Sequence, residues 1–416
     1  GVVMNRTKIC IPIVEKTKES IIDKAEEYAE LHAELVEWRV DFFEGEESEI
    51  LEIVRAVKKA IKDKDLIVTI RTIQEGGEEN GARFDYKGVL EEILHDGYAD
   101  FIDVEVAYKD VVTTLVEQRD KLTVGGNHSK LIGSYHNFSE TPSEEFIFNK
   151  LDECREDGLD VGKVACMPKS TEDVDVLLDS TEKYKKDHKE YPIITMSMGE
   201  YGKRTRLYGG LYGSEVTFAC VGKASAPGQV ELDEVNKLFD GIFSGNRHIS
   251  LIGFMGVGKS TISAELAKLT GRPEVDADVY IEKREGMKIS DIFASRGEEY
   301  FRDIETEILD ELAGMEPMIL SCGGGMAIRK INVKKLQNMG DVVLLTAEPE
   351  TIYERVKDSN TRPLLNGNMN VEYIAELMAK RKPFYEEAAT IKVKTDGRGA
   401  EEIAREIVRL TDNVIC

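Results

Sequence analysis

The feature that most limits the fold is an alternation of short β-rich runs with longer amphipathic stretches between residues 8 and 221. The stretches, such as residues 18–32 and 143–157, repeat their apolar residues at helical spacing. Strand, helix, strand order indicates parallel strands, and eight such units in roughly 230 residues predict a (β/α)₈ barrel. The β-rich runs are "KICIPIV", "AELVEWRVD", "DLIVTIRT", "FIDVEV", "KLIGSYHN", "VGKVACMP", "PIITMSM" and "SEVTFACV".

The rest of the chain predicts a second α/β domain. A strand-like run, "HISLIGF", opens it, and the later runs "PMILSC", "DVVLLTA" and "TIKVKT" alternate with charged helical stretches. This order is typical of an open, doubly wound parallel sheet. We therefore predict a barrel at residues 6–242, a polar linker at 243–247 and a doubly wound domain at 248–416.

The charge balance excludes some classes of partner. The chain has 55 Lys and Arg against 79 Asp and Glu, a formal net charge of −24. Nucleic-acid backbones and anionic membranes attract cationic surfaces, so we expect neither as a partner. No run approaches the roughly 18 apolar residues of a membrane helix. The start lacks the pattern of a secretory signal, and the six cysteines form no C-x-x-C pair, so we expect a cytoplasmic protein with reduced thiols.

The segment "GFMGVGKS", from Gly253 to Ser260, fits the pattern G-x-x-x-x-G-K-[ST]. In such a loop backbone N–H groups surround phosphate oxygens, the lysine reaches the β- and γ-phosphates and the hydroxyl binds Mg²⁺. An ordinary Gly-rich turn is the alternative, but the flanking strand and helix patterns favour a nucleotide site. The predicted ATP-binding residues are Gly253, Gly256, Gly258, Lys259, Ser260, Thr261 and Arg362.

Other polar pairs follow in the second domain. Asp276 and Asp278 are two residues apart, so an extended segment would place both carboxylates on one face, one near Mg²⁺ and one near a substrate hydroxyl. Taken alone, the pair also fits a solvated turn. Arg302 and Glu305 are spaced i, i+3 on a predicted helix, where an ordinary surface ion pair is the alternative.

In chain order, "GFMGVGKST", "DAD", "FRDIE", "GGG", "RPLL" and the pair Arg381 and Tyr385 resemble shikimate kinase across residues 248–410. The resemblance implies an NMP-kinase-like fold that transfers the γ-phosphoryl group of ATP to the 3-hydroxyl of shikimate. It also implies that Asp278 orients or deprotonates this hydroxyl, that Asp276 lies beside Mg²⁺ with Ser260, and that Arg362 belongs to a lid. The implied shikimate-binding residues are Asp278, Arg302, Gly324 and Arg381.

In the barrel half, polar residues follow the predicted strands, at the end where barrel enzymes carry their chemistry. A lysine inside a β-rich run is costly to bury unless it is neutral or paired, and a desolvated lysine can form an imine with a ketone. A histidine and a carboxylate nearby would suit proton abstraction next to a carbonyl. A hydrogen-bonded structural histidine and a rim lysine are the alternatives. The residues are Glu37, Arg39, Asp41, Arg71, Glu75, Asp103, Glu105, His136 and Lys163.

The stretches "EWRVD", "TIRTIQEGG", "IGSYHNF", "KVACMP", "MSMGEYGKRTR" and "SAPGQ" resemble type I 3-dehydroquinate dehydratase over residues 6–242. The resemblance implies that Lys163 forms an imine with the substrate ketone. It implies that His136, oriented by Glu105, removes the C2 proton and then protonates the departing hydroxyl, giving 3-dehydroshikimate. The implied substrate-binding residues are Glu37, Arg39, Arg71, Arg206, Ser225 and Gln229.

Further expectations follow from this second resemblance. Arg206 is the strongest candidate for the substrate carboxylate because a guanidinium can bind it with two hydrogen bonds. Thr205 stands where the family commonly has serine, and we expect little effect because a hydroxyl remains. The resemblance implies that this half needs no metal or cofactor, and it suggests a homodimer through the barrel.

Together the resemblances predict a bifunctional shikimate-pathway enzyme with ATP and Mg²⁺ as cofactors and small molecules as its partners. The two reactions are not consecutive, because a nicotinamide-dependent reduction must intervene and no G-x-G-x-x-G segment supplies it. One alternative is an aldolase-like Schiff-base lyase fused to a P-loop kinase for another small hydroxy-compound. Another is a binding or scaffolding protein with inactive sites.

Overall fold

The computed structural model describes residues 6–222, 228–242, 248–357 and 370–412. The chain divides into two compact units, one within Arg6–Lys237 and the other within Leu238–Cys416.

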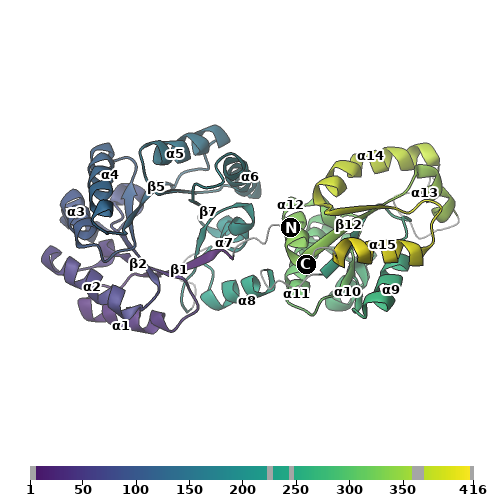
Figure 1. The fold of residues 1–416 in the computed structure, drawn as a ribbon, viewed down its shortest axis with the longest axis horizontal. Helices are drawn as coiled ribbons and strands as arrows, with labels where there is room; N and C mark the ends of the chain where they lie inside the picture. The colour runs from purple at the N-terminus through teal and green to yellow at the C-terminus, as the bar shows by residue number, and fades with distance from the viewer. Residues whose placement is uncertain (1–5, 223–227, 243–247, 358–369, 413–416) are drawn as a thin grey trace. The chain divides into compact units, whose positions relative to one another are not determined.

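The first unit is a parallel barrel, drawn in purple to teal in Figure 1. The sheet runs in the order β7-β6-β5-β4-β3-β2-β1-β8. Its two ends meet where the backbone N–H of Glu215 donates to the carbonyl of Ile193 at 2.8 Å, so the barrel is nearly closed. The strands are β1 (Lys8–Ile13), β2 (Leu35–Arg39), β3 (Asp65–Thr69), β4 (Phe101–Glu105), β5 (Lys130–Asn137), β6 (Val161–Cys166), β7 (Ile193–Ser197) and β8 (Val216–Phe218).

Helices surround these strands because each amphipathic stretch packs its apolar face against the sheet. On β2 the side chains alternate: Leu35 belongs to the apolar cluster inside the barrel, whereas Trp38 packs outside against Phe43. The helices are α1 (Lys18–Ala29), α2 (Ile50–Ala60), α3 (Tyr86–Asp96), α4 (Lys109–Val124), α5 (Glu144–Glu156), α6 (Thr171–Asp187) and α7 (Lys203–Tyr208), followed by α8 (Leu232–Ile242), which begins in this unit and continues past its last residue, Lys237. Short 3₁₀ turns include η1 (Val40–Phe42), η3 (Ile73–Glu75) and η4 (Glu79–Arg83).

The second unit has a five-stranded parallel sheet in the order β10-β11-β9-β12-β13. β9 is the central strand, with β11 and β10 on one side of it and β12 and β13 on the other. The carboxyl end of β9 therefore lies at the point where the strand order reverses, which is where such sheets bind ligands. The strands are β9 (His248–Ile252), β10 (Glu274–Asp276), β11 (Ile319–Ser321), β12 (Gly340–Thr346) and β13 (Ile391–Lys394).

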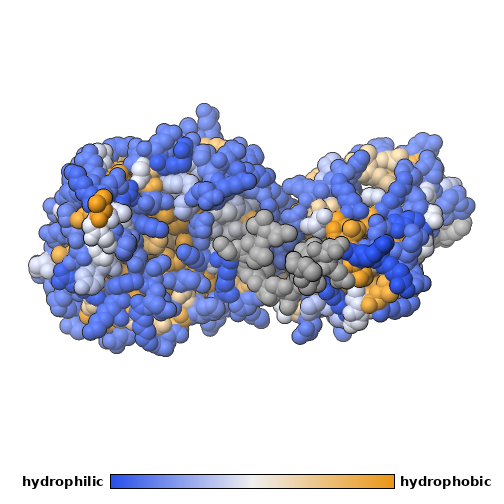
Figure 2. All heavy atoms as spheres, viewed as in Figure 1, coloured by the Kyte–Doolittle hydropathy of each residue, from blue (hydrophilic) through white to orange (hydrophobic). Residues whose placement is uncertain are grey.

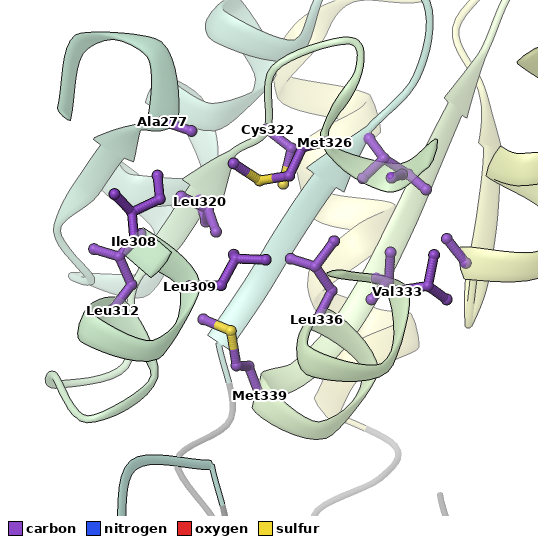
Figure 3. Packing of buried hydrophobic residues seen from close by; sticks show 14 of the residues in the cluster. Ala277, Ile308, Leu309, Leu312, Leu320, Cys322, Met326, Val333, Leu336 and Met339 are labelled. Atoms are coloured by element: carbon purple, nitrogen blue, oxygen red, sulfur yellow. The ribbon is translucent and has the colours of Figure 1, made fainter. Parts of the chain in front are cut away.

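Two apolar clusters form the core of this unit. One, shown in Figure 3, includes Leu309 and Leu312 of α11, Leu336 of α12 and Leu320 of β11. The other packs α9 and α15 against β9 and β12. Helices therefore cover both sides of the parallel sheet, and the prediction of a doubly wound domain is confirmed. The helices are α9 (Lys259–Thr270), α10 (Ala277–Glu285), α11 (Ile289–Ala313), α12 (Lys330–Met339), α13 (Pro349–Val356), α14 (Val371–Ala388) and α15 (Ala400–Asp412).

The surface agrees with the charged composition of the chain. On the face shown in Figure 2 hydrophilic side chains dominate, with apolar groups scattered between them. Among the described residues, no helix is both long enough and apolar enough to cross a bilayer.

Candidate active sites

Lys163 lies in the middle of β6 and points into the barrel. Only 5% of the residue is exposed, and its Nζ lies 4.4 Å from the centroid of the Phe218 ring. Burial lowers the pKa of Lys163, while the carboxylates of Glu37 and Asp103 act in the opposite direction. A larger fraction of neutral amine makes this lysine a better nucleophile than a surface lysine.

His136 pairs with Glu75 beside it. His136 lies near the end of β5, and its Nδ1 is 2.8 Å from Oε2 of Glu75 in η3. Burial raises the pKa of Glu75 to about 8, and the nearby Glu105 adds to the effect. Burial also lowers the pKa of His136 well below its usual range, helped by the positive charges of Arg71 and Lys163. Both shifts favour the uncharged forms of the two side chains, which suits proton exchange with a substrate.

This pairing corrects the expectation that Glu105 orients His136. Glu105 is fully buried, and its carboxylate accepts hydrogen bonds from the backbone N–H of Thr72 at 2.9 Å and the Thr72 hydroxyl at 2.7 Å. The segment after β3 turns back at Gly76, where φ is +83°, and this turn brings Glu75 to His136. The sequence indicated that Glu75 follows a strand. It could not indicate that Glu75 is the partner of His136, because that contact depends on the path of the turn at Gly76.

Arg71 lies inside a network of protein carboxylates. Its Nη1 and Nη2 donate to the two oxygens of Asp103 at 3.0 Å each, and Nη1 also donates to Ser134 at 2.9 Å. Glu105 lies 3.2 Å from Nη1. The Arg71 guanidinium thus balances two buried negative charges next to Lys163, and its direct contact with substrate stays a prediction.

Glu37 and Arg39 lie at the end of β2. The hydroxyl of Thr69 donates to the Glu37 carboxylate at 2.8 Å, and Arg39 is held by Asp41. Thr205 donates from its hydroxyl to the carbonyl of Gly202 at 2.8 Å and accepts from the backbone N–H of Ser197 at 3.0 Å, so this hydroxyl ties α7 to β7.

Arg206 of α7 has a buried guanidinium donor that is available to bind an anion. Its Nη1 donates to the carbonyl of Phe218 at 3.3 Å, whereas its buried Nε has no hydrogen-bond partner among the described residues. Burial lowers the pKa of this guanidinium. Because a buried donor without a partner is costly, a carboxylate bound here would be stabilised. Gln229 is half-buried, and Ser225 lies outside the described residues.

The second unit has a cavity of about 890 Å³ at the carboxyl ends of β9, β10 and β11. The predicted phosphate-binding segment, residues 253–260, contributes one wall. Gly258 is the N-cap residue of α9 and has φ +104°, a conformation that favours glycine. Lys259 donates from Nζ to the carbonyl oxygens of Gly253 and Phe254, at 2.7 and 3.2 Å. Ser260 and Thr261 follow in the first turn of α9 and line the same cavity.

Asp276 and Asp278 both line this cavity. They do not share an extended segment, because β10 ends at Asp276 and α10 begins at Ala277. Asp276 caps α10 by accepting a hydrogen bond from the backbone N–H of Val279 at 3.1 Å, a role for which Asp is among the preferred residues. Burial and the neighbouring Asp276 raise the pKa of Asp278, while Lys259 and Arg302 oppose the shift.

Two arginines converge on the Gly-rich segment after β11. Arg302 Nη1 contacts Oε2 of Glu305 at 2.7 Å, and Arg381 Nη1 donates to the carbonyl of Gly324 at 3.1 Å. A Cβ atom added to Gly325 would lie 2.1 Å from Arg302 Nη1, so glycine permits this close approach. Glu305, which also fitted an exposed ion pair, is only 1% exposed and belongs to the cavity wall.

Arg355 is a cavity residue that the sequence motifs did not single out. Its Nη1 donates to the carbonyl of Val257 at 3.0 Å and to the hydroxyl of Thr395 at 3.2 Å. It therefore links the phosphate-binding segment to the segment after β13. Only its contacts in space reveal this role. Arg362 lies outside the described residues.

The donor set of the cavity fits a magnesium nucleotide. Mg²⁺ commonly binds proteins through one or two carboxylates while phosphates and water complete its shell. A hydroxyl at Ser260 and a carboxylate at Asp276, both of which line the cavity, meet this need. No group of three or more His, Cys, Asp or Glu suited to a metal occurs within the described parts of the chain.

Comparisons with known proteins agree with this geometry. The family model for type I 3-dehydroquinase matches residues 9–245, and the model for shikimate kinase matches residues 255–412. A 3-dehydroquinate dehydratase of Clostridioides difficile is 39% identical over 238 residues, which is 56% of this chain and 91% of the relative.

Solved structures give the same picture for the barrel. A type I 3-dehydroquinate dehydratase from Clostridium difficile has 37% identity and a TM-score of 0.54, and the match covers 58% of this chain and 94% of that chain. A 3-dehydroquinate dehydratase from Geobacillus kaustophilus has 32% identity, a TM-score of 0.53 and coverages of 58% and 93%. This chain belongs to the type I 3-dehydroquinase family and carries a shikimate kinase domain after its barrel, so it joins two shikimate-pathway activities in one polypeptide.

Proposed function

We propose that Lys163 of this bifunctional enzyme forms the imine through which the barrel dehydrates 3-dehydroquinate. The observation that carries the proposal is a buried lysine with a lowered pKa in the same barrel interior as a buried His136 and Glu75 pair. The neutral amine attacks the ketone carbon, and the ketone oxygen leaves as water when the imine forms. The similar Clostridium difficile enzyme was crystallised with covalently modified comenic acid, which supports covalent chemistry in this fold.

His136 then removes a proton from C2 of the imine. Its Nδ1 is engaged by Glu75, so Nε2 is the nitrogen that exchanges the proton. The electron pair of the C2–H bond enters the imine system as an enamine and then expels the hydroxyl, which leaves as water with the proton from His136. Hydrolysis of the product imine consumes one water, releases 3-dehydroshikimate and restores Lys163. The net reaction is the loss of one water molecule.

Substrate orientation in the barrel is assigned to side chains at the strand ends. Arg206 binds the substrate carboxylate because its buried Nε needs an acceptor. Glu37, Arg39 and Gln229 contact the hydroxyl groups. Arg71 and Ser225 complete the proposed set, and Arg71 acts as the cation that pairs with Asp103 and Glu105 beside the imine.

In the second unit we assign ATP to the phosphate-binding segment and shikimate to the opposite wall. Gly253, Gly256, Gly258, Lys259 and Thr261 hold phosphates. Mg²⁺, held by Ser260 and Asp276, neutralises phosphate charge when bound. Arg302 and Arg381 bind the shikimate carboxylate beside Gly324. Asp278 accepts the proton of the 3-hydroxyl as its oxygen attacks the γ-phosphorus, and ADP leaves. Arg362 stays predicted to belong to a lid over the phosphates.

We also propose the domain bounds, the cellular location, the oligomeric state and the partners of the enzyme. We assign the dehydratase to residues 6–242, a linker to 243–247 and the kinase to 248–416, in a cytoplasmic protein whose barrels form a homodimer. Its partners are 3-dehydroquinate, shikimate and ATP rather than nucleic acid or membrane. A separate nicotinamide-dependent enzyme must reduce 3-dehydroshikimate before the kinase can act on the product.

Trapping the imine tests the dehydratase mechanism. The full chain is treated with borohydride in the presence of 3-dehydroquinate, and intact-mass and peptide-map analysis locate the adduct. We expect one covalent adduct on Lys163, because borohydride reduces an imine to a stable amine. Lys163→Ala is the matched control and should give none. A folded wild-type protein without an adduct at Lys163 would refute the Schiff-base mechanism.

A further inference from the structure

Asp41 is a buried carboxylate that takes no direct part in the proposed reaction. It lies in η1 directly after β2 and is fully buried. Its Oδ1 accepts hydrogen bonds from Arg39 Nε at 2.8 Å and from the backbone N–H of Arg71 at 3.2 Å. Its Oδ2 accepts from Arg39 Nη2 at 2.7 Å and from the backbone N–H of Glu78 at 3.1 Å. Both oxygens are therefore held by two donors each.

The two hydrogen bonds from Arg39, one to each oxygen of Asp41, fix the Arg39 side chain. Two parallel N–H to oxygen bonds set the plane of a guanidinium as well as its position. The Arg39 side chain keeps 21% of its surface exposed, whereas Asp41 keeps none. Arg39 can thus face a substrate while Asp41 holds it from behind.

The two hydrogen bonds from backbone N–H groups to Asp41 fix the segment that carries Glu75. Residues 71 and 78 flank η3, and both donate their backbone N–H to Asp41. Within the segment, the N–H of Gly77 donates to the carbonyl of Thr72 at 2.7 Å, which closes the turn. Gly81 packs directly on Asp41, since a Cβ added there would lie 2.8 Å from the Asp41 Cβ. The segment is therefore held by Asp41 at residues 71, 78 and 81, in addition to the bonds from Thr72 to Glu105.

We propose that Asp41 is a positioning residue that places the substrate-binding Arg39 and the proton-transferring pair of Glu75 and His136 relative to each other. This inference rests on the function proposed above for the barrel. It explains why a carboxylate is needed: an ionised Asp carries only acceptors, whereas an Asn would turn an N–H₂ group toward at least two donors. An amide at this place leaves those buried donors unsatisfied.

The test is Asp41→Asn in the full chain, assayed for dehydration of 3-dehydroquinate. We expect kcat to fall and KM to rise, with kcat/KM lower by roughly 10- to 100-fold, because small misplacements of reacting groups are costly. Borohydride should still trap the imine on Lys163, since Lys163 lies on β6 and makes no bond to Asp41. Fluorescence of Trp38, which is buried on β2, reports whether the barrel has folded.

The matched control is Asp100→Asn. Asp100 precedes β4 at the other end of the barrel, where it accepts hydrogen bonds from Lys58 Nζ and the backbone N–H of Leu66, both at 2.7 Å. It joins a cation to a backbone amide as Asp41 does, but far from the strand ends that carry the site. We expect kcat and KM to stay within about 2-fold of wild type, because this end carries no chemistry.

Two further variants separate the two contacts of Asp41. Asp41→Asn in an Arg39→Ala background should still lower kcat, since the segment with Glu75 is still released. Glu78→Pro removes one N–H donor to Asp41 at a residue whose φ of −80° suits proline, so it should lower kcat with little change in KM. This second variant also serves if Asp41→Asn does not fold.

Three results would overturn the proposal: an unchanged kcat in folded Asp41→Asn, no added effect in the Arg39→Ala background, or an unchanged kcat in Glu78→Pro. Failure of the Schiff-base mechanism looks different, because then the wild type itself gives no adduct at Lys163.

Discussion

Lys163, His136 and Glu75 share one interior, and burial moves their three pKa values in different directions. The pKa values of the lysine and the histidine fall, while that of Glu75 rises to about 8. In each case burial disfavours the charged form. The result is a lysine with a larger neutral fraction beside a pair that can exchange a proton with a substrate.

Glu75→Gln tests this electrostatic account through stability. A carboxyl with a folded pKa near 8 and an ordinary pKa of 4.5 contributes stability that is complete below pH 4.5 and is lost as the pH rises to 8. The variant lacks this loss, so the free energy of unfolding of the variant minus that of wild type should increase by roughly 1 to 3 kcal/mol between pH 5 and 8.5. Dehydratase kcat should fall at every pH.

The measurement is denaturant unfolding followed by Trp38 fluorescence, which reports on the barrel because the chain has a single tryptophan. A stability difference that does not change with pH would contradict the raised pKa of Glu75.

Asp278→Asn tests the base proposed for the kinase. The amide cannot accept the proton of the shikimate hydroxyl, so kcat should fall by roughly 10²- to 10⁴-fold. Nucleotide binding, measured by calorimetry with ATP and Mg²⁺, should change little because the phosphates are proposed to bind Lys259 and its neighbours rather than Asp278. The raised pKa of Asp278 also predicts that wild-type kinase activity declines on the acid side as this carboxylate is protonated. Normal turnover in the variant would remove Asp278 from this role.

The elements that carry these residues could be predicted from the sequence to different degrees. The eight barrel strands were visible because buried β-rich runs alternate with helical periodicity, and the phosphate-binding segment was visible because its glycines have fixed spacing. The partner of His136 was predicted wrongly because it depends on the turn at Gly76. Arg355 has no local signal, since its contacts with Val257 and Thr395 join segments far apart in the chain.

The Gly-rich segment between β11 and the 3₁₀ turn at Met326–Ile328 can be tested by a substitution at Gly325. Gly325→Ala places a Cβ where Arg302 Nη1 lies, so the guanidinium must move. We expect the KM for shikimate to rise by roughly 10-fold while the KM for ATP stays the same. Gly399→Ala is the control, because nothing lies within 4 Å of its added Cβ. An unchanged shikimate KM in Gly325→Ala would show that this approach does not matter for binding.

At the scale of the whole molecule, the chain holds two compact units, each with its own core and its own set of site residues. The proposed dehydratase residues all lie within the first unit and the proposed kinase residues within the second. The two reactions are also separated by a reduction that the chain does not provide in any recognised motif. The account therefore predicts that each activity depends only on residues of its own unit.

The most direct test of this central claim is to measure both activities in three preparations of the full chain: wild type, Lys163→Ala and Lys259→Ala. The wild type should dehydrate 3-dehydroquinate and phosphorylate shikimate. Lys163→Ala should lose dehydration and keep the wild-type rate of phosphorylation, and Lys259→Ala should show the reverse. The retained activity of each variant shows that its unmutated unit has folded. Circular dichroism, together with Trp38 fluorescence for the barrel, reports whether the mutated unit has folded. A folded variant that loses both activities, or keeps the activity assigned to its mutated lysine, would contradict the account.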